Sequence, residues 1–424
     1  MTKKAKGNVK EFLKKASLNR KKILLCTRPI SPPWDEASKN IAWKIARHCR
    51  GPFEFHVLTA KNMPIVDTIE KHRRDVSKGQ SSMDDREQRA LIICEPIYTS
   101  SKFRWPQKIQ LLNRLFLHRL NADIIHFLFT PRPITSFLIK TRLFFSKIKT
   151  IQTVTTVTMK REQNSIRLKK TLFADKIIVQ SNHTYNKLNE SGMNGTQVIY
   201  PGINLEKFRP ASKDKKVMQR LGLEEKNFVV MFAGEYTKIR GIDNVLESFE
   251  IICSNKNLRC GPVRHNVNYK LIIACRIKNK ADKKKKDQIQ KKIENTNYGQ
   301  NIIFIDRYRG MPKLYNISDV NLFTVNEMTK KIDIPFVIIE AMACAKSVII
   351  SDIPVLKEFI KNGRNGLVVQ NNDPQKIAAC IVRLAKNPTL KEKLGREALK
   401  YAQKNFDVKK NIPLYETVYK QLIQ

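Results

Sequence analysis

The feature that most constrains this chain is a repeated alternation of short apolar runs with longer amphipathic segments. It begins with an apolar run at residues 21–27, continues with an amphipathic segment at 37–49, and returns to an apolar run at 53–59. Short apolar runs of this kind predict buried strands, and the amphipathic segments between them predict helices. A succession of strand, helix and strand implies a mainly parallel sheet that helices cover on both faces.

The alternation falls into two groups. Further expected strands of the first group lie at 122–129, 150–157, 174–181 and 196–203, and those of the second at 227–235, 269–275, 301–307, 319–325, 346–352 and 366–370. Two groups predict two doubly wound domains. Ligands of such sheets bind outside the carboxyl ends of the strands. We therefore expect the active site in a cleft between the domains, built from the loops 28–35, 130–133, 234–241, 307–310 and 326–339.

The joint between the two groups lies near residues 201–216, which hold Pro201, Gly202 and Pro210 and then become strongly charged. This composition is typical of a linker. The predicted division is an N-terminal domain at 1–203, a linker at 204–216, a C-terminal domain at 217–405 and a final helix at 406–424. We expect that helix to pack back toward the N-terminal domain.

The charge of the chain is unusual, because 80 Lys and Arg oppose 38 Asp and Glu and give a net charge of +42. Such a field attracts nucleic acid, anionic membranes or phosphorylated substrates. The eight cysteines are dispersed and form no C-x-x-C pair, which is typical of reduced thiols in a cytosolic protein. No apolar run approaches the roughly 18 residues of a membrane span, and the first residues show no secretory signal. We therefore expect a cytoplasmic protein that touches a membrane only from its face.

The most informative stretch is residues 330–369, where a loop with Asp333 and Pro335 leads into VIIEAMACA. This segment predicts a helix with Glu340 in its first turn. The free N–H groups of a helix N-terminus bind phosphate, and an adjacent carboxylate accepts hydrogen bonds from a ribose diol. The alternative is that Glu340 only complements the helix dipole. The segment alone leaves both interpretations open.

The same stretch resembles the donor-binding signature of family 4 glycosyltransferases with the GT-B fold, in which two glutamates are separated by seven residues and the second begins E-A-M-A-x-G-x-P-V-I. The segments 174–210, 232–252 and 314–324 resemble other motifs of that family in order and spacing, so the similarity covers the chain from about residue 120 onward. The resemblance implies two Rossmann-like domains that face each other across a cleft. It also implies a retaining enzyme that moves a sugar from a nucleoside diphosphate sugar to an acceptor, with the acceptor side at 1–203 and the donor site at 217–405.

The motif positions suggest individual roles. Glu340 matches the second glutamate of the signature, which binds the donor ribose. The first glutamate, which contacts the sugar, falls on Ile332, so we expect Asp333 to take over that contact. Arg240 matches the lysine that binds the donor diphosphate. Its companion arginine falls on Glu235, an acid, and Lys238 or Arg276 is the expected substitute.

Further donor contacts follow from the same resemblance. Arg307 and Tyr308 match residues beside the base, although a solvated turn closed by Gly310 explains them equally well. The amides of Phe336 and Val337 are expected to face the phosphates, and Gly234 begins the loop toward Arg240. The first half lacks the family's paired glycines and one of its histidines. His126 is a residue of the cleft or, alternatively, a satisfied core residue.

The chemistry implied by these residues needs no metal or other cofactor. Glycosyl transfer develops negative charge on the departing diphosphate, which cations and amides stabilise. Arg240 and Asp333 are the catalytic candidates. No D-x-D motif for a divalent ion is apparent, and His and Cys are dispersed. We therefore expect protein groups alone to stabilise the leaving group.

Residues 101–149 interleave cations with bulky apolar residues and contain Asp123 as their only acid. This pattern, which recurs at 8–22, is typical of a surface for anionic lipid, and the resemblance implies a lipid-linked or cell-envelope glycan precursor as acceptor. The plainer alternative is a set of ordinary amphipathic helices. Three other functions remain open. The first is a basic nucleic-acid-binding protein, although the sequence shows no helix-turn-helix, zinc finger or RNP-like strand. The others are a nucleotide-sugar epimerase of the same fold, and a binding protein without catalysis because of Glu235 and Ile332.

Overall fold

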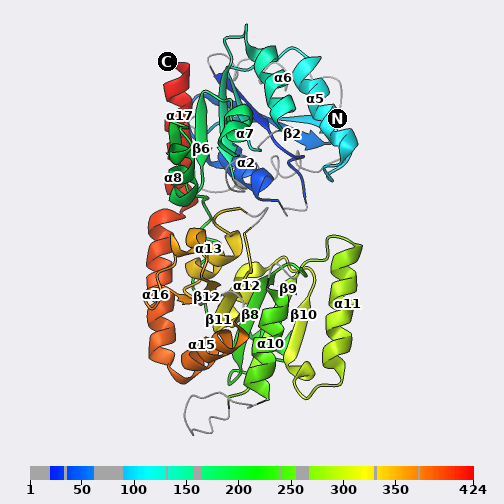
Figure 1. Ribbon diagram of the computed structural model, residues 1–424, viewed down its shortest axis with the longest axis vertical. Helices are drawn as coiled ribbons and strands as arrows, with labels where there is room; N and C mark the ends of the chain where they lie inside the picture. Colours follow the sequence, from blue (N-terminus) through cyan, green and yellow to red (C-terminus); the bar gives the residue numbers. More distant parts are fainter. Residues whose placement is uncertain are drawn as a thin grey trace, which may run out of the picture. The chain divides into compact units, whose positions relative to one another are not determined.

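The computed structural model describes residues 20–32, 36–61, 89–129, 132–155, 164–237, 241–254, 267–328, 332–370 and 373–424. The chain divides into two compact units, which Figure 1 shows as ribbons. The first unit contains Met1–Gly202 and Val408–Gln424, and the second contains Ile203–Asp407. The second unit thus includes the segment that we expected to be a separate linker. There the N–H of Ala211 donates a hydrogen bond to Oδ1 of Asn316 at 3.0 Å.

The first unit is built on a seven-stranded parallel sheet of order β3-β2-β1-β4-β5-β6-β7. Its strands are β1 (Lys21–Cys26), β2 (Phe53–Ala60), β3 (Leu91–Tyr98), β4 (Ile124–Phe127), β5 (Lys149–Val154), β6 (Lys176–Val179) and β7 (Thr196–Val198). Its helices are α2 (Ala37–His48), α5 (Trp105–Phe116), α6 (Pro133–Leu143), α7 (Asn164–Thr171), α8 (Asn182–Glu190) and α17 (Val408–Ile423). The expected strands all form. We did not expect β3, because Glu95 and Pro96 interrupt its apolar run.

The second unit is built on a six-stranded parallel sheet of order β10-β9-β8-β11-β12-β13. Its strands are β8 (Phe228–Gly234), β9 (Tyr269–Cys275), β10 (Ile302–Ile305), β11 (Val320–Phe323), β12 (Ser347–Ser351) and β13 (Leu367–Val369). Its helices are α9 (Lys215–Arg220), α10 (Ile242–Cys253), α11 (Lys280–Glu294), α12 (Met311–Ile317), α13 (Phe336–Ala343), α14 (Pro354–Lys357), α15 (Pro374–Lys386) and α16 (Pro388–Asn405). The expectation of two parallel α/β domains is confirmed.

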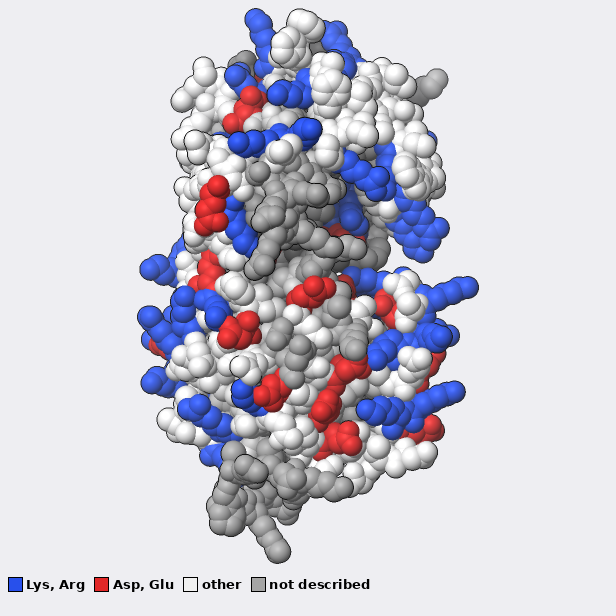
Figure 2. Space-filling model, viewed as in Figure 1, with Lys and Arg blue, Asp and Glu red and all other residues white. Residues whose placement is uncertain are grey.

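The surface reflects the excess of positive charge. Figure 2 shows Lys and Arg side chains over much of the visible face of both units, with fewer Asp and Glu between them. None of the helices in the described ranges combines the length and the apolar character needed to cross a bilayer.

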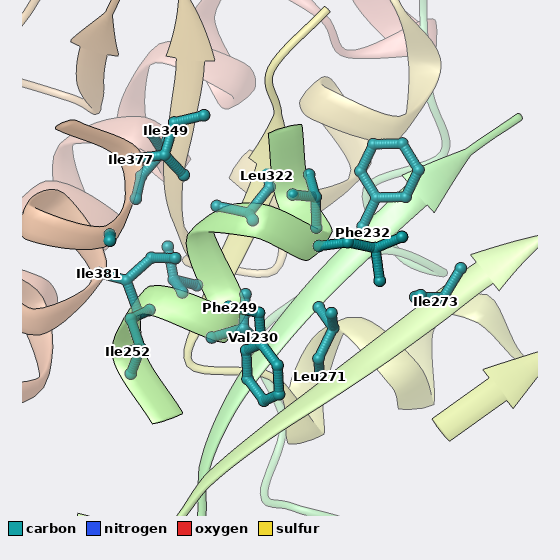
Figure 3. Packing of buried hydrophobic residues seen from close by; sticks show 14 of the residues in the cluster. Val230, Phe232, Phe249, Ile252, Leu271, Ile273, Leu322, Ile349, Ile377 and Ile381 are labelled. Carbon is teal, nitrogen blue, oxygen red and sulfur yellow. The ribbon is translucent and has the colours of Figure 1, made fainter. Parts of the chain in front are cut away.

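The core of the second unit lies between its sheet and the helices α10 and α15. Val230 and Phe232 of β8 meet Phe249 of α10 and Ile381 of α15 in one cluster, which Figure 3 shows from close by. These side chains are at most 1% exposed, and each contributes roughly 1.5–3 kcal/mol by its burial. The cluster holds the central strands rigid, and with them the loops that follow their carboxyl ends.

His126 belongs to the core of the first unit. It is fully buried in β4, where Nδ1 lies 2.8 Å from the hydroxyl of Tyr419 and Nε2 lies 2.7 Å from Oγ1 of Thr153. Burial lowers the pKa of this imidazole to about 3. Of the two interpretations that the sequence left open, the structure supports the satisfied core residue. Tyr419 comes from α17, so this network also fixes the final helix within the first unit.

Candidate active site

The candidate site lies at the carboxyl edge of the second sheet. Strands β8 and β11 are parallel neighbours, with Phe232 opposite Leu322, so the loops that follow them start at the same edge. The loop after β8 leads into α10, and the loop after β11 leads into α13. Two helix N-termini are thus placed at one edge by adjacent strands, which is where open α/β sheets bind their ligands.

Gly241 fixes the close approach of these two loops. Its φ angle is +78°, and a Cβ added at this position would lie 1.6 Å from the carbonyl oxygen of Thr324, directly after β11. Only glycine combines this backbone conformation with this contact. One turn later, Nδ2 of Asn244 donates a hydrogen bond to Oδ1 of Asn326 at 3.2 Å. The start of α10 is therefore anchored to the loop that leads to α13.

The cap positions of these two helices are occupied by residues without a polar side chain. The cap position of α10 is Gly241, and that of α13 is Pro335; neither makes a side-chain cap hydrogen bond. The N–H groups of a first helical turn have no acceptor within their own helix, and the helix dipole adds positive potential there. Pro335 sets φ at −67° and directs the chain into α13 without donating a hydrogen bond itself. Such an arrangement is suited to a phosphate or diphosphate.

Glu340 is the fifth residue of α13 and is half-buried. The sequence had placed it in the first turn, but it lies beyond that turn because α13 begins earlier, at Phe336. Its Oε2 accepts a hydrogen bond of 2.9 Å from the hydroxyl of Tyr315, a fully buried residue of α12. Burial, and then the charge of Glu340, raise the pKa of Tyr315 well above its usual value, so the phenol stays protonated and keeps donating. Tyr315 was not among the site residues expected from the sequence. Its place before the strand in LYNISDVNLFT marks it as buried, but nothing in the sequence pairs it with Glu340.

Three further residues expected at the donor site lie on the same segment. Phe336 and Val337 are the first two residues of α13, and both are half-buried. Asp333 lies in the loop directly before the helix and is 7% exposed. A buried carboxylate needs polar neighbours, since burial of an isolated charge is costly. The structure thus brings Asp333, Phe336, Val337 and Glu340 together around one helix start.

Gly234 ends β8, the neighbouring strand, so it lies at the same edge. A Cβ here would meet the ring of Phe232 at 2.9 Å. The next residue, Glu235, replaces the arginine of the motif. Its Oε1 is paired with Nζ of Lys278 at 2.5 Å, and Lys278 is a cation that the sequence patterns did not single out.

Arg307 and Tyr308 lie after β10, which is two strands from β8 in the sheet. At about 4.8 Å per strand, this places their loop about 10 Å from the end of β8. Arg307 is exposed. The ring of Tyr308 is half-buried, and the guanidinium carbon of Arg220 lies 5.5 Å from its centroid. One face of Tyr308 therefore already has a cationic partner within the unit.

Two predicted residues, Lys238 and Arg240, lie outside the described residues, so their roles depend on the motif alone. Within the residues that the structure describes, no three His, Cys, Asp or Glu side chains gather as metal ligands would.

Comparison with known proteins agrees with this geometry. Residues 213–401, which contain the whole candidate site, match the family model described as glycosyl transferases group 1. The resemblance to glycosyltransferases that the sequence motifs indicated is therefore confirmed.

Two curated relatives and one solved structure illustrate the similarity. An uncharacterized glycosyltransferase of Methanocaldococcus jannaschii is 22% identical over 252 residues, which is 59% of this chain and 59% of the relative. The capsular polysaccharide biosynthesis glycosyltransferase CapM of Staphylococcus aureus is 25% identical and matches 54% of each chain. The Anabaena protein HepE, solved with UDP and glucose, superposes with a TM-score of 0.67 at 17% identity, over 94% of this chain and 99% of its own. Such a superposition establishes a shared GT-B fold.

Proposed function

We propose that this chain, whose residues 213–401 form a glycosyl transferases group 1 domain, transfers a sugar from a nucleoside diphosphate sugar to an acceptor with retention of configuration. One observation carries the proposal. The N-termini of α10 and α13 follow the carboxyl ends of two adjacent strands, beside a carboxylate that Tyr315 orients. This combination offers donors for a diphosphate and an acceptor for a ribose diol within one site.

The proposed mechanism uses these groups for different parts of the donor. As the bond between the sugar and the diphosphate breaks, negative charge grows on the leaving phosphate and positive charge on the sugar ring. The first-turn amides of α13, from Phe336 and Val337, and the cation of Arg240 stabilise the leaving group. Glu340 holds the ribose, and Asp333 contacts the transferred sugar. Groups that stabilise charge present mainly in the transition state raise the turnover rate, rather than only tightening the binding of the donor.

The proposed acceptor is a lipid-linked or cell-envelope glycan precursor, reached from the cytoplasmic face of a membrane. The relationship to a capsular polysaccharide glycosyltransferase supports this class of acceptor. The strongly basic composition supports a location beside anionic lipid. The expected donor is a nucleotide sugar. Because HepE was solved with bound UDP, UDP-sugars are the first donors to test.

The test begins with a thermal-shift screen of nucleoside diphosphates and their sugars, because a ligand that binds only the folded state raises the midpoint. The protein is then incubated with membrane-lipid extracts and the nucleotide sugar that gives the largest shift. The released nucleoside diphosphate and the glycosylated product are measured. A transferase forms both in equal amounts, whereas an epimerase changes the sugar without releasing diphosphate. A protein that shows no shift with any of these ligands does not have the proposed function.

A further inference from the structure

Large apolar side chains exposed to solvent gather in one part of the first unit. Of eleven such residues in the described ranges, all except Leu414 come from α5, α6, α7 or the residues directly after α5 and α6. Nine of them form what we call the α5–α6 surface: Trp105, Ile109, Leu112, Leu117, Ile134, Phe137, Leu138, Phe144 and Phe145. The described part of the second unit exposes no residue of this kind. Concentrations of this sort mark interaction sites, whereas scattered single residues do not.

Helix α5 carries apolar side chains on two faces, one buried and one exposed. Leu111 and Leu115, four residues apart, are buried against the sheet. Trp105, Ile109 and Leu112 also follow helical spacing, but their side chains are exposed by 71%, 52% and 36%. A helix that only covers a sheet would carry polar residues on its outer face. The outer apolar face of α5 is therefore in excess of what the fold requires.

Helix α6 repeats this arrangement. Ile139 and Leu143 are buried, whereas Ile134 and Phe137 are 76% and 68% exposed on the other side. The chain continues with Phe144 and Phe145, whose rings pack edge to face at 5.0 Å while they remain 72% and 95% exposed. Two adjacent aromatic rings on a loop are suited to insertion into an apolar layer.

The two helices lie on the same side of the sheet. Leu111 and Leu115 of α5 and Ile139 and Leu143 of α6 belong to one core cluster with Leu24, Ile125 and Phe127 of the strands. Figure 1 draws both helices at the same flank of the first unit. Their outer faces therefore form one surface rather than two separate patches.

Exposed cations are interspersed in the sequence with these apolar residues. The exposed basic residues between 101 and 150 are Lys102, Arg104, Lys108, Arg119, Arg132, Lys140, Arg142, Lys147 and Lys149. The only acid in this stretch is Asp123, and its carboxylate accepts the N–H of Lys22 at 2.7 Å. Nζ of Lys108 lies 4.8 Å from the centroid of the Trp105 ring, so cation and indole share one face of α5. Figure 2 shows blue side chains along the flank where Figure 1 draws α5.

We propose that the α5–α6 surface docks on an anionic lipid bilayer. The cations lie where lipid phosphates would be, and the aromatic and aliphatic side chains lie where the interface becomes apolar. A second copy of the chain is a poor partner, because it would bring the same nine cations against each other. Trp105 is also the residue type that favours the boundary between headgroups and acyl chains. This inference depends on the first unit alone and not on the donor chemistry of the second.

The proposal is tested by co-sedimentation of the full chain with vesicles of phosphatidylcholine, with or without phosphatidylglycerol, across a salt series. We expect binding to the anionic vesicles at low salt and much weaker binding to the neutral ones. Screening shortens electrostatic attraction to about 8 Å at physiological salt, so binding falls as salt rises, while apolar insertion maintains a residual part.

Two double variants separate the contributions of charge and of apolar contact. Arg104→Glu with Lys108→Glu should weaken anionic-vesicle binding about tenfold or more at low salt. Trp105→Ser with Phe137→Ser should remove the part that resists salt. The controls are Lys283→Glu with Lys284→Glu on α11, which changes net charge equally, and Leu414→Ser; both should bind as the wild type does. All affected side chains are exposed, so the variants are expected to fold.

Failure of wild type to sediment with anionic vesicles at low salt would overturn the proposal. So would equal loss in the α5 and α11 charge variants, which would indicate an effect of net charge alone. A dimer in solution that Phe137→Ser dissociates would identify a second copy as the occupant instead. Thermal shifts with nucleoside diphosphates are measured on the same samples, so failure of the donor site is distinguishable from failure of membrane docking.

Discussion

The hydroxyl of Tyr315 donates a hydrogen bond of 2.9 Å to Oε2 of Glu340 and so connects the buried helix α12 to the start of α13. Tyr315 is completely buried, whereas Glu340 is half-buried. This bond fixes the orientation of the Glu340 carboxylate. In the proposed site Tyr315 is therefore a positioning residue, and Glu340 is the residue that contacts the ribose.

Replacement of Tyr315 by Phe removes this hydroxyl and keeps the ring. We expect a loss of about 0.5–1.5 kcal/mol in binding of the preferred nucleoside diphosphate, as measured by calorimetry. Binding of inorganic pyrophosphate, which has no ribose, should not change. The matched control is Tyr298→Phe, since Tyr298 is a buried tyrosine of the same unit whose hydroxyl bonds to Glu250. Equal loss of nucleotide affinity in both variants would contradict the positioning role.

Gly241→Ala tests the contact between the two loops of the site. Its added Cβ would collide with the carbonyl oxygen of Thr324, so α10 must move. Gly363→Ala is the control: φ is +72° there, close to the +78° of Gly241, but a Cβ would meet nothing within 4 Å. Both variants incur the conformational cost of about 1 kcal/mol, and the difference in their unfolding free energies isolates the collision. We expect Gly241→Ala to lose more stability by at least about 2 kcal/mol, and to lose nucleotide binding as well.

The first unit contains a pH-sensitive cluster of His56 with Glu54, Glu95 and Arg114. Nδ1 of His56 lies 2.7 Å from Glu95, and Nε2 lies 2.8 Å from Glu54. Burial acts to lower the pKa of His56, but the hydrogen bonds to the two glutamates outweigh it and raise the pKa above 6.5. For Glu95, burial acts to raise the pKa, but His56 and Arg114 lower it to about 2.

The signs of these shifts fix the expected pH dependence. A raised pKa in the folded state means that protonated His56 stabilises the unit fully below pH 6.5 and that this contribution is lost as pH rises through the folded pKa. The contribution of Glu95 is present above its usual pKa and is lost only as pH falls toward 2. Urea denaturation at pH 6 and pH 8 should therefore show a decrease in unfolding free energy that is smaller in His56→Gln. A variant with the same decrease as wild type would exclude His56 as its source.

Asp333→Asn tests the contact with the transferred sugar. The substitution preserves the shape of the side chain in the loop before α13 and removes its charge. Affinity for the nucleotide sugar should fall. The turnover rate should also fall, by roughly tenfold, which corresponds to about 1.4 kcal/mol in the activation free energy. Affinity for the free diphosphate should stay the same, because it has no sugar. If both affinities fall together, Asp333 only supports the loop.

Most of the fold follows from local patterns in the sequence, because buried parallel strands are short apolar runs whose length and spacing stand out. The strand β3 was not predicted because Glu95 and Pro96 lie inside it. The presence of Glu95 in a strand is explained by its partners His56 and Arg114, which come from other elements. The motif around Glu340 predicted a helix at this place, but α13 begins at Phe336, so Glu340 lies beyond its first turn and not within it as expected. What sequence patterns do not contain is the pairing of distant side chains, such as Tyr315 with Glu340 and Glu235 with Lys278. Those pairs depend on tertiary packing.

The exposed apolar residues show a similar limit. In sequence, Leu111 and Leu112 look alike, and the stretch 101–149 suggested a lipid-binding surface without saying which residues face outward. The structure buries Leu111 and exposes Leu112. Phe116, another bulky apolar residue of this stretch, packs partly buried against the core cluster. Only the helix orientation on the sheet distinguishes these positions.

The central claim is that the donor ribose is held by Glu340 at the start of α13. Its most direct test is calorimetric titration of wild type and Glu340→Ala with the nucleoside diphosphate that gives the largest thermal shift, and with pyrophosphate as the ribose-free control. We predict that the dissociation constant for the nucleoside diphosphate rises about tenfold, or about 1.4 kcal/mol, while that for pyrophosphate stays unchanged. An unchanged dissociation constant for the nucleoside diphosphate in Glu340→Ala would contradict the account.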